Sequence, residues 1–88
     1  MAIERFQWTE HAEQRLDERG LARDDVERAI GDGHADRQIN TGSADWRVYG
    51  TRSDDKSFAV LYNNPVDGDA GAVRIVSAWP MRAKKPRA

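Results

Sequence analysis

One histidine and two arginines are spaced four residues apart near the start of the chain. They are His11, Arg15 and Arg19, in the run His11-Ala-Glu-Gln-Arg15-Leu-Asp-Glu-Arg19-Gly20, and we call them the His/Arg stripe. On a helix these positions fall within an arc of roughly 80° and are stacked over about 12 Å. Arginine matches phosphate oxygens two at a time, and imidazole moves protons near neutral pH. The stripe therefore indicates chemistry on a phosphodiester.

Length and composition limit the class of protein. Eighty-eight residues, 39% of them hydrophobic, are enough for one domain, which we predict over residues 1–81. The chain is too polar for a membrane span or a signal peptide, so we expect a cytoplasmic protein without membrane contact. It has no cysteine and only two histidines, and we predict no metal and no cofactor.

The net charge of −1 conceals an uneven distribution. Residues 1–36 carry five arginines and ten acidic residues, whereas residues 37–88 carry nine basic and five acidic residues. The basic residues 82–88 form either a disordered tail or, with Arg47 and Arg74, a phosphate-binding face. The acidic half is either a solvated surface or a docking site for a basic partner protein.

Helical signals predict a first helix that the His/Arg stripe borders. Thr9 is a good N-cap, and the apolar positions Ala12 and Leu16 lie next to the stripe, which places the stripe at the border of the core. Gly20 fits the left-handed position of a Schellman motif, with Leu21 packing back on Leu16. The first helix is therefore expected to end at this glycine.

A second helix and four strands follow. The helix is predicted to start near Asp24, where Glu27 forms a capping box, and to end in the glycines at 31–33. After the second helix the hydrophobic pattern changes from a helical period to that of extended strands. Antiparallel strands are predicted at residues 37–40, 46–51, 57–62 and 72–78. The third of them is apolar throughout and is predicted to be central. The expected fold class is α+β, with two N-terminal helices packed on a four-stranded antiparallel sheet.

Two segments resemble known sequences. Residues 8–21, followed by an acidic second helix, resemble a family of small bacterial and phage proteins that is marked by a His-Ala-x-x-Arg-x-x-x-Arg-Gly-hydrophobic motif, and the resemblance spans roughly residues 6–79. The closing strand at 73–79 is similar to the ending of that family and to the RIISAR strand of BrnT toxins. These proteins look like members of the RelE, BrnT and barnase-like or colicin-like group of ribonucleases. Many of that group are toxins of toxin–antitoxin modules or delivered effectors.

The resemblance implies metal-independent RNA cleavage, with RNA as the partner and a cognate antitoxin or immunity protein as a second one. Five residues match positions of the motif, of the strand before the central one and of the last strand: His11, Arg15, Arg19, Arg47 and Ser77. The chain departs from the pattern at Ala22, where Ser or Thr is common, and at Trp79, which replaces a tyrosine. The second departure removes a phenolic hydroxyl that could join proton transfer.

In this interpretation His11 is the base for the 2′-hydroxyl, and Arg15 and Arg19 hold the phosphate. The pattern contains no separate general acid for the 5′-oxygen leaving group. Either His11 serves as the acid after it has taken the first proton, or Arg47 stabilises the leaving oxygen electrostatically. Contacts from the sheet to the substrate are expected from Ser77, Tyr49 and Arg74, provided that Ser77 and Tyr49 point towards the first helix. The alternative bases are Glu10 and Glu18.

Each functional interpretation has a structural alternative. The stripe is also typical of a solvated helix face on which Arg15 pairs with Glu18. His34 is expected to be an exposed turn residue, outside the site. Three large aromatic residues either stack on bases or, as we expect in so small a domain, fill the core: Trp46, Tyr62 and Trp79. The alternative to an endoribonuclease is a noncatalytic module that binds nucleic acid or protein. An antitoxin-like interaction protein belongs to this alternative.

Overall fold

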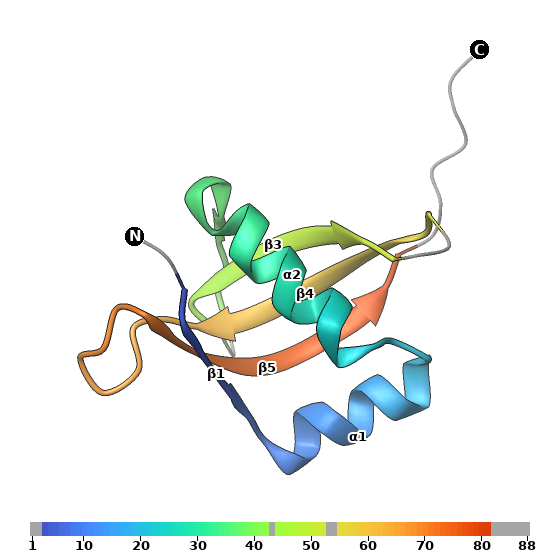
Figure 1. Cartoon of the computed structure of the whole chain (residues 1–88), viewed down its shortest axis with the longest axis horizontal. Helices are drawn as coiled ribbons and strands as arrows, with labels where there is room; N and C mark the ends of the chain where they lie inside the picture. Colours follow the sequence, from blue (N-terminus) through green and yellow to red (C-terminus); the bar gives the residue numbers. More distant parts are fainter. Residues whose placement is uncertain (1–2, 43, 53–54, 82–88) are drawn as a thin grey trace.

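The computed structural model describes residues 3–42, 44–52 and 55–81, and Figure 1 shows the arrangement of its elements. The helices are α1 (Glu10–Arg19), α2 (Arg23–Gly33) and a short 3-10 helix, η1 (His34–Asp36). The strands are β1 (Arg5–Trp8), β2 (Gln38–Ile39), β3 (Trp46–Thr51), β4 (Ser57–Asn63) and β5 (Ala72–Pro80). The basic tail predicted at 82–88 lies outside the described residues. Within them, no helix has the length and apolar character needed to cross a membrane.

Helix α1 begins and ends where the sequence predicts. The side chain of Thr9 accepts the backbone N–H of Ala12 at 3.0 Å. At the other end Gly20 has a φ of 67°, and the N–H of Leu21 bonds to the carbonyl of Leu16 at 3.0 Å. This is the Schellman arrangement, and it favours glycine because its φ is positive.

Helix α2 begins without the predicted capping box. Its N-cap is Ala22, which makes no side-chain cap, and Asp24 lies inside the first turn. Glu27 accepts a hydrogen bond from the indole N–H of Trp8 at 2.8 Å. The carboxylate that was expected to cap the helix therefore ties α2 to the end of β1.

In the described residues the sheet has five strands in the order β1-β5-β4-β3-β2 and is mixed, which corrects the prediction of four antiparallel strands. Strands β2 to β5 pair antiparallel, and β4 is central as predicted. Strand β1 is the missing one, and it pairs parallel to β5 from Arg5 opposite Ala72 to Trp8 opposite Ile75. Four residues are too few to show a clear alternating pattern, so this strand gives almost no sequence signal.

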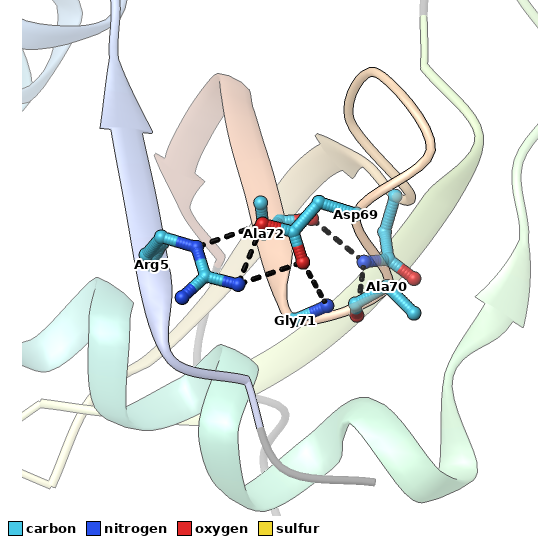
Figure 2. A network of polar contacts seen from close by, with 6 residues as sticks. Arg5, Asp69, Ala70, Gly71 and Ala72 are labelled. Carbon is cyan, nitrogen blue, oxygen red and sulfur yellow. Dashed lines mark hydrogen bonds and ion pairs between the residues drawn. The ribbon is translucent and has the colours of Figure 1, made fainter.

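An ion pair anchors the start of β1 to the loop that precedes β5. The guanidinium of Arg5 donates to both carboxylate oxygens of Asp69, at 2.8 and 2.7 Å, and the same carboxylate accepts the N–H of Gly71 at 3.0 Å (Figure 2). The amide of Asn64 donates to the carbonyls of Ala70 and Ala72. These contacts fix the loop against β1 and so set the parallel register.

Both helices cover one face of the sheet. Buried residues of α1 and α2 share one core with alternate residues of the strands, which are Val48, Phe58, Val60, Tyr62, Val73, Ile75 and Ala78. The intervening strand residues point to the other face, since successive side chains of a strand alternate. We call it the open face, because no helix or strand of the described residues covers it.

Candidate functional site

Four of the predicted site residues lie on the open face: Arg47, Tyr49, Arg74 and Ser77. Arg47 is opposite Leu61 and Leu61 is opposite Ser77, so these residues form one row across three strands. Two strand spacings separate the ends of this row by about 10 Å. The register also places Tyr49 on the open face, and it therefore points away from α1 rather than towards it as the prediction required.

An aromatic row lies beside the row that contains Arg47. Tyr49, which is 44% exposed, is opposite Ala59, and Ala59 is opposite Trp79. Ala59 is only 1% exposed, as expected for a small side chain between two rings. Trp79 was expected in the core, but it lies half-buried on the open face. Tyr62 is in the core as predicted, and its side chain is completely buried.

The open face is basic, and its arginines are held by neutral side chains. The five strands contain three arginines and no acidic residue. Arg5 is neutralised by Asp69. Arg47 donates to the Gln38 side chain at 3.3 Å, and Arg74 donates to the Gln7 side chain at 3.3 Å. Among the described residues no carboxylate pairs with Arg47 or Arg74, so their positive charges are available to a polyanion.

The helical layer has the opposite charge. Helices α1 and α2 contain eight acidic residues and four arginines. A charge difference between the two layers orients an approaching polyanion towards the open face.

The His/Arg stripe lies on the flank of α1 that faces away from α2. On the other flank Glu13 pairs with Arg23, the first residue of α2. On the stripe, Arg15 Nε lies 3.4 Å from Nε2 of the exposed His11, while its Nη1 pairs with Glu18 at 3.2 Å. The Arg15–Glu18 pair is the one expected of a solvated helix face.

Arg19 leaves the solvated face and contacts the sheet. Its Nη1 donates to the carbonyl of Ala78 at 2.6 Å and to the hydroxyl of Ser77 at 3.3 Å. This approach is open because β1 stops pairing with β5 at Ile75. The stripe is thereby continuous with the row of Ser77, Leu61 and Arg47 on the open face.

The structure thus joins the predicted site residues in two groups and adds one residue to them. Arg15 contacts His11, and Arg19 contacts Ser77, whereas Arg74 lies further along β5 beside Gln7. Trp79 is the addition. The described residues contain no group of three or more His, Asp or Glu side chains that could hold a metal ion.

The second histidine is not the exposed turn residue that was predicted. His34 is half-buried in η1, and its Nδ1 lies 2.6 Å from the hydroxyl of Tyr62. No local pattern signals this contact, because the two residues are 28 positions apart.

The fold and the site define a two-layer α+β domain with a basic, partly aromatic sheet face and a cationic helix flank. The chain belongs to the family described as a domain of unknown function, DUF4258, whose model matches residues 8–80. This match runs from the end of β1 to the end of β5 and includes the whole His/Arg stripe. Neither a curated protein nor a solved structure matches the chain.

Proposed function

We propose that this protein is a metal-independent endoribonuclease of the toxin type, which binds single-stranded RNA on the open face and cleaves it at the His/Arg stripe. The observation that carries the proposal is the contact of Arg19 with Ser77, because it makes the stripe and the open face one continuous surface. The similarity of the closing strand at 73–79 to that of BrnT toxins, together with the resemblance of the motif's family to the RelE and BrnT group, favours the same function. A protein of this type acts in the cytoplasm and is paired with an antitoxin or immunity protein.

The chemistry assigns separate roles to the two parts of the surface. His11 takes the proton of a 2′-hydroxyl, the freed oxygen attacks the adjacent phosphorus, and the bond to the 5′-oxygen breaks. The imidazolium then returns the proton to the 5′-oxygen. Arg15, which touches His11, is the cation placed to stabilise the charge on the phosphorane. The expected products carry a 2′,3′-cyclic phosphate and a 5′-hydroxyl.

The open face supplies binding. Arg47 and Arg74 contact the phosphates of flanking nucleotides, and Tyr49 and Trp79 offer ring surfaces on which unpaired bases stack. Because stacking requires bases that are not paired, the face favours single-stranded RNA over a duplex.

A noncatalytic RNA-binding module is the second candidate function. It is favoured by the Arg15–Glu18 pair, which partly neutralises the cation next to His11. In that case the open face binds RNA and no bond is broken.

Purified full-length protein and an end-labelled single-stranded RNA in the presence of EDTA test the proposal. We expect cleavage by the wild type, loss of cleavage in His11→Ala, and unchanged cleavage in Gln14→Ala, an exposed α1 variant outside the stripe. Binding without cleavage supports the noncatalytic module. Intact RNA at high protein concentration, or equal cleavage by wild type and His11→Ala, overturns the proposal.

A further inference from the structure

A polar hollow lies between the end of α2 and the loop that connects β4 to β5. Its volume is about 330 Å³, and it is lined by Gly31, His34, Ala35, Arg37, Asn64 and Ala70. A hollow of this size is at the lower end of the range of small-molecule sites. Of the described residues that line it, none belongs to the His/Arg stripe or to the open face, and none carries a carboxylate.

The ring of His34 is held in one orientation by the core. The hydroxyl of Tyr62 lies 2.6 Å from Nδ1. Burial raises the pKa of Tyr62 to about 12, so the phenol keeps its proton. Its O–H therefore donates a hydrogen bond to Nδ1 of His34. Burial, and then the charge of Arg37, lower the pKa of His34, which favours the neutral form of the ring. Nε2 then carries the ring proton and points away from Tyr62.

Arg37 is also held in place. Its guanidinium lies over the ring of Trp46, with the carbon 4.1 Å from the ring centroid, and Nη1 donates to the carbonyl of His34 at 2.9 Å. Its Nε is buried and has no hydrogen-bond partner within the part of the chain that the structure describes. Among the described residues no carboxylate pairs with Arg37, so an oriented cation lines the hollow without a counter-ion.

From these contacts we propose that the hollow binds the phosphate group of a phosphorylated small molecule of nucleotide size. Arg37 supplies the N–H groups of Nη1 and Nη2 that the carbonyl of His34 leaves free, and His34 supplies the Nε2 proton. A guanidinium suits phosphate because its charged N–H groups form charge-assisted hydrogen bonds with the phosphate oxygens. The ring of His34 and the stacked guanidinium are already ordered, so that binding loses little side-chain freedom. This site is separate from the proposed ribonuclease site.

NMR titration of the full-length protein with adenosine monophosphate tests this site, with inorganic phosphate and a single-stranded oligoribonucleotide as further probes. We expect saturable shifts of the His34 ring and Trp46 indole resonances, with those of His11 unchanged. Arg37→Gln is expected to weaken binding by about tenfold or more. Arg37→Lys, which keeps the charge and the stacked stem, is expected to weaken it less. Arg28→Gln, at an exposed arginine of α2, is the matched control and is expected to bind as the wild type.

The outcomes separate the two sites and the sources of the phosphate. Saturation by adenosine monophosphate or inorganic phosphate alone assigns the hollow to a free ligand, and saturation of the same resonances only by the oligoribonucleotide assigns it to an RNA end. Either supports a phosphate site. The absence of saturable shifts with all three probes, or equal binding by folded Arg37→Gln and wild type, overturns it. Arg37→Gln keeps RNA cleavage if the ribonuclease site is separate, so that this proposal and the proposed function fail independently.

Discussion

Arg19, at the end of α1, is hydrogen-bonded to Ser77 of β5, a residue 58 positions later in the chain. The same guanidinium nitrogen bonds to the carbonyl of Ala78 at 2.6 Å. The contact lies beyond the point where β1 covers the edge of β5, and it therefore protects that edge as well as joining the helix flank to the open face.

Replacing Arg19 is expected to reduce stability as well as RNA cleavage. Arg19→Gln loses a charge-assisted hydrogen bond to a strand carbonyl, and we expect the free energy of unfolding to fall by about 1–2 kcal/mol. Ser77→Ala loses only the longer contact and is expected to cost less than about 1 kcal/mol. Urea unfolding of the three proteins measures the difference. Equal losses would show that the carbonyl contact is unimportant.

The Arg5–Asp69 pair predicts a pH dependence of stability. The hydrogen bonds from Arg5, and then from Gly71, hold the pKa of Asp69 below its ordinary value of 3.8 in the folded protein. The contribution of this carboxylate is therefore complete above that value and is lost as the pH falls through the lowered folded pKa. We expect Asp69→Asn to flatten the acid limb of the unfolding free energy against pH. Asp67→Asn, in the same loop, is the control and is expected to follow the wild type; superimposable acid limbs for Asp69→Asn and wild type would contradict the prediction.

Gly50 allows α2 to approach β3 closely. A Cβ atom there would lie 2.5 Å from Cβ of Ala29 and 2.7 Å from Cζ of Phe58. We expect Gly50→Ala to destabilise the protein by about 1–3 kcal/mol, because the core would be overpacked. Gly31→Ala, where the added group meets no atom of the described residues within 4 Å, is expected to stabilise α2 by about 0.5–1 kcal/mol. Thermal unfolding measures the change in stability of both variants. Unchanged stability in Gly50→Ala would show that the helical layer and the sheet are free to move apart.

The aromatic row predicts RNA affinity independently of cleavage. In a His11→Ala background, Tyr49→Ala is expected to weaken binding of a single-stranded oligoribonucleotide by about 1–3 kcal/mol through the loss of one stacked base. Ile39→Ala is the control, since Ile39 is 74% exposed but its partner Trp46 places it on the other side of the sheet. Fluorescence anisotropy measures both affinities. Unchanged affinity in Tyr49→Ala would exclude stacking on this residue.

Local signals were sufficient for the parts of the fold that local contacts determine. Thr9 and Gly20 define the ends of α1 because each acts within its own helix terminus. Strand β3 has the predicted bounds because turn residues flank it on both sides. Contacts between distant segments were not predictable in this way. Glu27 has the spacing of a capping residue, but its carboxylate binds Trp8, 19 positions earlier.

The candidate site shows the same division. The prediction that the His/Arg stripe lies along a single helix is confirmed, because helical spacing is a local and regular signal. The face on which Ser77 and Trp79 lie depends on one extra residue in β5, where Leu61 pairs with Ser77 but Tyr62 pairs with Ile75. A shift of one residue exchanges the two faces of a strand. The size of Trp79 favours the core, but this register places it on the open face.

The most direct measurement uses an oligodeoxynucleotide that contains a single ribonucleotide. Cleavage through a 2′-hydroxyl occurs only at that nucleotide, and it leaves a 2′,3′-cyclic phosphate and a 5′-hydroxyl. We predict this single cut by the wild type in EDTA and none by His11→Ala. An intact oligonucleotide, a cut at deoxynucleotides, or the same cut by His11→Ala would contradict the assignment of His11 as the base.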